Sequence, residues 1–188
     1  MKQRDIYVDV AKGICMLLII CIHTEVFGVI GMPLTFIAVP MFFFMSGFYD
    51  HSERAWSQWL VKSAGSLLMP AFAWCIIGAL YLNLLTYFKS GEVNFVFDVY
   101  SPCHYDGPAW FLLSLFFTKI IIGVLARTRL SQYLLFPLCF GIGYLGSKYQ
   151  MPLNIDEALA AVPLYYCGKF IYPKLKDSPY GDKCPNKC

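Results

Sequence analysis

Two titratable side chains inside the first apolar segment are the residues of this chain best suited to chemistry. Lys12 and His23 are separated by ten residues. In an α-helix, eleven steps of about 100° amount to three turns plus about 20°, so both side chains project from one helix face. The rise is about 16 Å, so a Lys12 near one membrane surface places His23 near mid-bilayer. A titratable ring at that depth is costly unless it has a use, which makes His23 a candidate catalytic base.

The imidazole of His23 has two interpretations that the residues alone leave open. As a general base it would accept a proton from an attacking hydroxyl, and burial would keep the ring neutral for that task. The alternative is a neutral imidazole that only hydrogen-bonds to a neighbouring helix. Lys12 and Arg4, at the start of the same segment, form a cationic cluster. The alternative for them is an ordinary positively charged cytoplasmic anchor.

Four further residues could carry chemistry, and each has a simpler structural interpretation. Ser46 could act as a nucleophile, but Ser-Gly at a helix end is more often a packing device. Trp110 opens an apolar segment, where membrane-interface aromatics are common. His104 and Asp106 form an external H-x-D pair that could hold a metal, yet a solvated loop is the expected outcome. We therefore predict no metal site.

The elements that must position these residues are long apolar segments. The chain has 188 residues, of which 58% are hydrophobic and only 14% charged, whereas soluble domains carry about 25% charged residues. Apolar stretches long enough to cross a bilayer recur, which predicts an all-α, polytopic membrane bundle. The expected spans are approximately Gly13–Ile30, Pro33–Tyr49, Ser63–Tyr87, Pro108–Ala126, Ser131–Ser147 and Glu157–Tyr172.

The basic residues predict the orientation of these six spans. With a cytoplasmic N-terminus, the outside loops carry only Lys89 and Lys148, and Lys119 lies within a span, which leaves twelve of the fifteen Lys and Arg on the inside. Cytoplasmic loops carry such an excess, so both termini are expected in the cytoplasm. Residues 173–188 read as a short disordered tail, and no footprint for nucleic acid is visible.

Cysteine, glycine and tryptophan residues predict how the segments pack. Five of the eight cysteines lie in the expected spans and are predicted to be free thiols: Cys15, Cys21, Cys75, Cys139 and Cys167. The fifth span has small residues suited to close helix packing, namely Gly141, Gly143 and Gly146. Trp56 and Trp59, three apart among polar neighbours, predict a helix over residues 51–62 in the cytoplasmic interface.

Several segments together resemble the acyltransferase 3 family of membrane acyltransferases. The first is an R/K-x10-H pattern, matched by Lys12 and His23 and preceded by Arg4-Asp5-x3-Asp9. The second is an aromatic run that ends in Ser-Gly-Phe, matched by residues 40–48, and the third is a Trp-Phe-Leu opening, matched by residues 110–112. The order and spacing of the three motifs resemble most the branch that includes fucose 4-O-acetylases.

The resemblance implies a reaction and roles for several residues. The family transfers an acyl group from acetyl-CoA on the cytoplasmic side to a hydroxyl of a cell-envelope glycan or lipid-linked sugar. By position, His23 would be the catalytic histidine and Lys12 its basic partner at the donor site. Arg4 and Arg54 would be further contacts for the CoA phosphates, while Ser46 and Trp110 would shape the substrate site. The expected setting is the lipid of a bacterial-type inner membrane.

The chain departs from the family in two ways. Arginines usually precede the proline of the third helix, whereas residues 62–70 offer one cation, Lys62. The family also spans the membrane roughly ten times, so residues 1–172 are expected to be the N-terminal part of that fold. Two alternatives stay open: a non-enzymatic transporter or glycan-export subunit, and an inactive truncated remnant.

Overall fold

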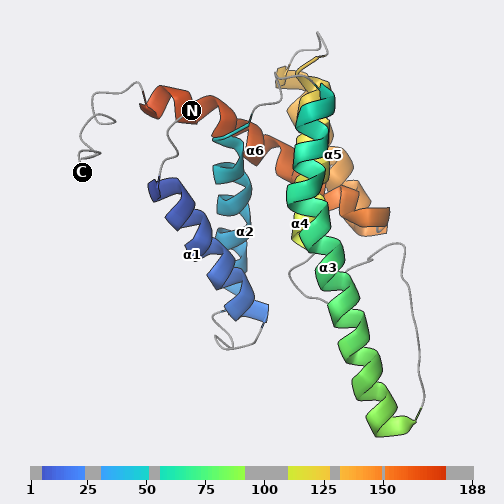
Figure 1. Cartoon of the computed structure of the whole chain (residues 1–188). Helices are drawn as coiled ribbons and strands as arrows, with labels where there is room; N and C mark the ends of the chain where they lie inside the picture. The colour runs from blue at the N-terminus through green and yellow to red at the C-terminus, as the bar shows by residue number, and fades with distance from the viewer. Residues whose placement is uncertain are drawn as a thin grey trace. The chain divides into compact units, whose positions relative to one another are not determined.

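The computed structural model describes residues 6–23, 31–50, 56–91, 110–127, 132–149 and 151–176. Within these ranges every regular element is helical, which agrees with the predicted all-α class (Figure 1). The six α-helices are α1 (Ile6–His23), α2 (Gly31–Gly47), α3 (Trp56–Ser90), α4 (Trp110–Leu125), α5 (Gln132–Tyr149) and α6 (Ile155–Lys176). A short 3-10 turn, η3 (Pro152–Asn154), precedes α6.

Each α-helix coincides with one of the expected apolar segments, although the bounds differ. Helix α1 begins at Ile6, well before the expected span, and Val8 in its first turns packs against α2. Helix α3 begins at Trp56, so the described part of the predicted interfacial helix is continuous with the third apolar segment. Among the described residues, α3 is the one helix long and apolar enough to cross a membrane, while Phe36–Gly47 and Trp110–Leu125 are shorter apolar stretches. That the chain crosses the membrane six times therefore stays a prediction.

The described chain divides into two compact units. The first contains α1, α2 and the part of α6 from Pro163 onward. In it α1 and α2 pack side by side as consecutive helices that run in opposite directions (Figure 1). Val8 and Cys15 of α1 form a buried cluster with Met45 of α2, so the first half of α1 contacts the end of α2.

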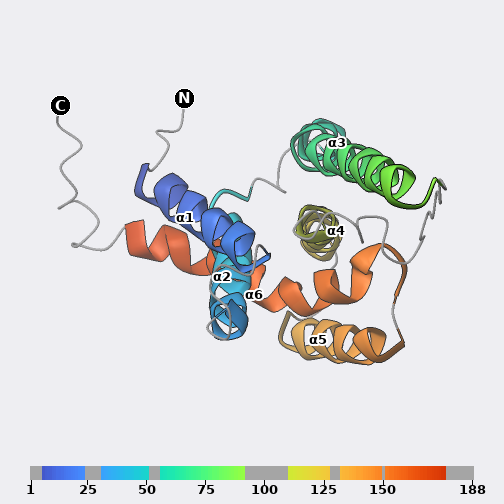
Figure 2. The ribbon, with the colours of Figure 1, turned by 90° about the horizontal axis from the view of Figure 1, so that it is seen from below.

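The second unit contains α3, α4, α5, η3 and α6 up to Val162. Helix α4 is its most buried element and lies alongside α3 (Figures 1 and 2). Thr118 of α4 donates a hydrogen bond of 3.0 Å to the carbonyl of Ala158, and Ser114 donates one of 3.2 Å to the carbonyl of Asn154. Because both hydroxyls are buried, these bonds satisfy polar groups that would otherwise be costly in an apolar core.

Tryptophan and glycine residues both contribute to packing in the second unit. Trp59 is buried and Trp56 half-buried, and both rings lie against Gly123 of α4, while the position of this segment at the membrane interface stays a prediction. A Cβ added at Gly143 would lie 2.8 Å from the Ala160 nitrogen, and Gly146 is similarly close to Asp156, which confirms two of the three predicted packing glycines. Gly141 faces open space, so the prediction for it is wrong: its position on the helix points it away from α6.

The cysteine prediction is correct for four of the five residues in the apolar segments. Cys15, Cys21, Cys139 and Cys167 are free thiols. Cys75 is disulfide-bonded, which corrects the prediction of a free thiol there. An apolar neighbourhood in the sequence does not reveal which second thiol the fold brings into bonding distance.

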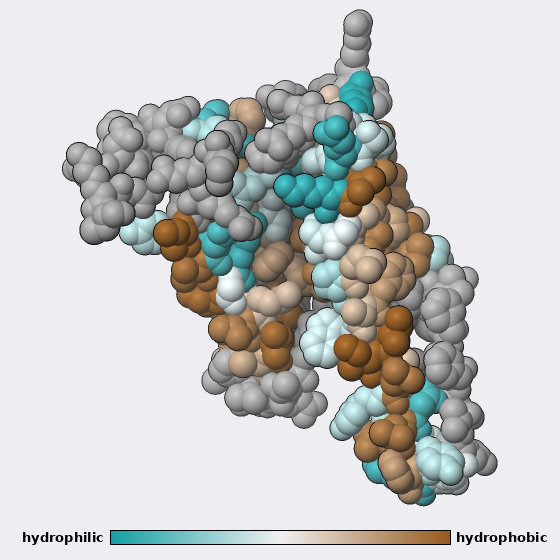
Figure 3. All heavy atoms as spheres, in the orientation of Figure 1, coloured by the Kyte–Doolittle hydropathy of each residue, from teal (hydrophilic) through white to brown (hydrophobic). Residues whose placement is uncertain are grey.

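Helix α3 exposes most of its apolar side chains. Phe72, Trp74 and Leu80 are each more than half exposed, and the hydrophobic residues are visible along α3 in the space-filling view (Figure 3). Soluble monomers rarely leave a helix of this length uncovered, whereas lipid tails solvate such a surface. The exposed apolar surface of α3 is therefore the element that best fits a bilayer.

Candidate functional site

Helix α1 carries both members of the predicted Lys–His pair. It is continuous from Ile6 to His23, so Lys12 and His23 lie on the same helix, three turns apart along its axis. His23 is its last residue, and the description of this position is limited to its backbone. The backbone of α1 therefore has the helical spacing that was expected to place Lys12 and His23 on one face.

The end of α2 lies beside Lys12. The Lys12 ammonium is 5.3 Å from the centre of the Tyr49 ring, within the range of a cation–π interaction. Tyr49 follows Ser46 and Gly47 at the end of α2, and Ser46 is buried with 7% of its surface exposed. Because α1 and α2 run in opposite directions, Ser46 lies at the Lys12 end of α1. Ser46 is thus grouped with the candidate donor-site cation and separated from the His23 backbone.

Aromatic rings connect this end of α2 to α6. Phe48 stacks on Tyr172 with ring centres 4.7 Å apart, and Tyr49 meets the same ring edge-on at 5.5 Å. Phe44 contacts Phe48 edge-on at 5.1 Å. Offset and edge-on pairs of this kind are favourable beyond the area that they bury. The aromatic run was singled out in the sequence, but its partner Tyr172 lies more than 120 residues later and could not be identified from the run itself.

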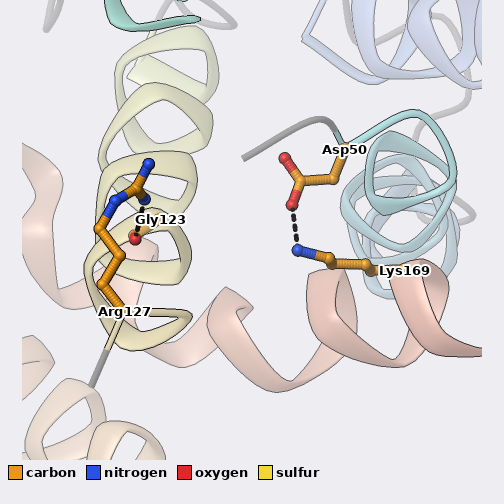
Figure 4. A network of polar contacts seen from close by, with 4 residues as sticks. All are labelled: Asp50, Gly123, Arg127 and Lys169. Atoms are coloured by element: carbon orange, nitrogen blue, oxygen red, sulfur yellow. Dashed lines mark hydrogen bonds and ion pairs between the residues drawn. The ribbon is translucent and has the colours of Figure 1, made fainter. Parts of the chain in front are cut away.

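A buried ion pair lies next to this aromatic cluster. The Lys169 ammonium of α6 is 2.8 Å from a carboxylate oxygen of Asp50, whose side chain is 1% exposed, and the two side chains point toward each other (Figure 4). The hydroxyl of Tyr165 is fully buried, interacts electrostatically with Asp50, and makes no hydrogen bond within the described residues. In the sequence, Lys169 is only one of the twelve Lys and Arg residues expected on the inside, and neither Asp50 nor Tyr165 stands out. The signal available in the sequence was that Lys169 is a charged residue inside an expected apolar segment, where a charge usually has a partner or a function.

The remaining predicted site residues belong to the second unit or lie outside the described residues. Trp110 belongs to the second unit, where it is half-buried and meets Phe111 edge-on at 6.5 Å. Arg4 and Arg54 lie outside the described residues, as do His104 and Asp106. In the part of the chain that the structure describes, no three His, Cys, Asp or Glu side chains gather where they could hold a metal ion.

The second unit has its own cationic contact. The Arg127 guanidinium lies 4.6 Å from the centre of the Trp56 ring and also donates a hydrogen bond to the carbonyl of Gly123 (Figure 4). The guanidinium thus caps the last turn of α4 while it lies within cation–π distance of an aromatic ring. These contacts account for Arg127 as a structural residue of the α3–α4 pair.

Comparisons with known proteins place the chain in a family. The family described as an acyltransferase domain, the acyltransferase 3 family, matches residues 5–176. No curated protein and no solved structure matches the chain. The matched region includes Lys12, His23, the end of α2 and the whole of α6. Because the match covers nearly the entire sequence, the chain belongs to the acyltransferase 3 family of membrane acyltransferases.

Proposed function

We propose that the protein is a membrane O-acetyltransferase that moves an acetyl group from cytoplasmic acetyl-CoA to a sugar hydroxyl of a cell-envelope glycan. The observation that carries the proposal is the unbroken helix α1, which holds Lys12 and His23 in the register of the family motif. Acyl transfer to a hydroxyl needs a base, and an anionic donor needs a cation. This helix supplies one of each.

Lys12 is the proposed contact for the donor phosphates. Its ammonium lies over the Tyr49 ring, whose face attracts a positive charge. Lysine binds phosphate oxygens through charge-assisted hydrogen bonds. Arg4 and Arg54, close in sequence to α1 and α3, are the proposed additional phosphate contacts, and Ser46 and Trp110 are proposed to shape the substrate site.

His23 is the proposed general base. Its neutral imidazole would accept the proton of the sugar hydroxyl as that oxygen attacks the thioester carbonyl. The carbon–sulfur bond then breaks, the CoA thiolate leaves, and the imidazolium returns a proton to it. A second route has the imidazole itself accept the acetyl group and pass it to the sugar. Both routes require the ring of His23.

The test uses the full 188-residue chain in membranes, with labelled acetyl-CoA and an extract of envelope glycans. We expect label transfer from the unmodified chain and loss of at least about 100-fold in His23→Ala, since general-base catalysis contributes about 10²–10⁴-fold. Leu17→Ala is the control, because Leu17 lies on the same helix and is 63% exposed. Transfer by His23→Ala at the unmodified rate would contradict the role of His23.

The same assay separates the proposed enzyme from its alternatives. A transporter or export subunit would show no dependence on acetyl-CoA, and an inactive remnant would transfer no label although the chain is inserted. Either result from the unmodified chain would overturn the proposed activity while leaving the family membership intact.

A further inference from the structure

The buried ion pair between Asp50 and Lys169 joins two parts of the first unit that are far apart in the sequence. The side chain of Asp50 is 1% exposed and that of Lys169 21%, so both charges have lost much of their water. Removing a charge from water is costly unless an opposite charge compensates it at close range. The contact of 2.8 Å between the two side chains meets that condition. It holds Asp50, three residues beyond the end of α2, against α6.

The backbones on either side make this contact specific. A Cβ added at Gly47 would collide with the backbone of Tyr165, and one added at Gly168 would collide with the carbonyl of Phe44. The two helices therefore approach as closely as glycine allows. Asp50 and Lys169 flank this crossing, and the crossing leaves little freedom to the chain between Gly47 and Asp50.

The ion pair is also linked to the candidate donor site through one residue. Tyr49 precedes Asp50 in the chain, and its ring lies 5.3 Å from the Lys12 ammonium and 5.5 Å from the Tyr172 ring. A shift of Asp50 would move Tyr49 and so change the surroundings of Lys12. The Tyr49 ring also contacts Tyr172, which, like Lys169, belongs to α6.

We propose that Asp50 and Lys169 are positioning residues. They hold the Tyr49 ring against Lys12 and thereby fix the position of the ammonium group that binds the acyl donor. The inference rests on the proposed function, because it assigns Lys12 to the donor. Asp50 and Lys169 are not assigned any contact with substrate. Their effect on the reaction passes through Tyr49, and it concerns donor binding more than the proton transfer at His23, which lies at the other end of α1.

The experiment measures KM for acetyl-CoA and kcat in membranes that carry the full chain. The variants are Lys169→Met, Tyr49→Leu, the double variant of these two, and the exchanged pair Asp50→Lys with Lys169→Asp. Lys174→Met is the matched control: Lys174 also lies on α6, but its ammonium lies over the Phe170 ring of its own helix. The amount of inserted protein is measured for every variant.

We expect Lys169→Met and Tyr49→Leu each to raise KM for acetyl-CoA about tenfold with kcat within about threefold, since residues in one network of contacts are energetically coupled. The double variant should exceed either single variant by no more than about twofold, because both changes interrupt one chain of contacts. The exchanged pair should recover most of the lost affinity, and Lys174→Met should leave KM within about twofold.

Three results would overturn the inference. One is an unchanged KM in Lys169→Met. Another is multiplication of the two single effects in the double variant, which would mean that Lys169 does not act through Tyr49. The third is a parallel loss of kcat and of inserted protein without recovery in the exchanged pair, which would mean a structural role only. Failure of the proposed function is distinguished by the unmodified chain, which would then show no turnover of acetyl-CoA.

Discussion

At the scale of single residues, Lys12 and Tyr165 show how a side chain can be judged by its surroundings. Lys12 lies on the first helix against an aromatic ring, whereas Tyr165 is fully buried with a hydroxyl that makes no hydrogen bond within the described residues. The first arrangement places a cation against an aromatic face at the proposed donor site. The second leaves a polar group that costs stability unless something else compensates it. Each leads to a prediction.

Replacement of Lys12 by Gln should raise KM for acetyl-CoA at least about tenfold, because a hydrogen bond to a charged group contributes about 1.5–3 kcal/mol. Lys12→Arg keeps the charge and the contact with Tyr49, and it should retain KM within about threefold. Initial rates against acetyl-CoA concentration in membranes measure both. An equal loss in the two variants would contradict a role for the charge itself.

Removal of the Tyr165 hydroxyl should not destabilise the protein. In Tyr165→Phe we expect the free energy of unfolding to stay within about 1 kcal/mol of the unmodified value, because the hydroxyl makes no hydrogen bond within the described residues and loses only its electrostatic interaction with Asp50. Tyr165→Ala is the comparison and should lose about 3–5 kcal/mol through the cavity left by the ring. Thermal unfolding in detergent measures both. A clear destabilisation of Tyr165→Phe would show that the hydroxyl donates a hydrogen bond to Asp50.

At the scale of elements, the crossing of α2 and α6 depends on glycine. A Cβ at Gly168 would meet the backbone carbonyl of Phe44, which cannot rotate away as a side chain could. We expect Gly168→Ala to lower the free energy of unfolding by about 1–3 kcal/mol, the usual cost of overpacking. The melting temperature in detergent is the measurement.

Gly141→Ala is the matched control for that change. Gly141 lies inside α5 with nothing near the place of its Cβ. Alanine is the better helix former, so the free energy of unfolding should rise by up to about 1 kcal/mol. Equal destabilisation of both variants would indicate that helix propensity, and not the crossing, governs the response.

At the scale of the whole molecule, the distribution of basic residues predicts the orientation in the membrane. Alkaline phosphatase fused after Gly91 should be active, because the loop after α3 is expected outside, whereas fluorescent protein fused to the C-terminus should fluoresce in the cytoplasm. An active phosphatase at the C-terminus would contradict the predicted orientation.

The chain should resist extraction with alkaline carbonate, since the apolar surface of α3 requires lipid.

The sequence alone determined the helical class, the approximate place of all six helices, the family and the Lys12–His23 register. These properties follow from local information: the apolar length of each segment, the angular period of a helix, and a motif within one helix. The helix bounds were less accurate, as the early start of α1 shows, where Val8 packs against α2.

The tertiary structure decided which residues meet across long separations. It paired Asp50 with Lys169, placed Tyr172 against Phe48 and Tyr49, and bonded Cys75 in a disulfide. It also brought neighbouring residues close to Gly143 and Gly146, but not to Gly141. Such contacts depend on the relative position of helices and on which face each helix turns to its neighbour. Periodicity defines the faces of one helix, but it does not identify the partner that covers each of them.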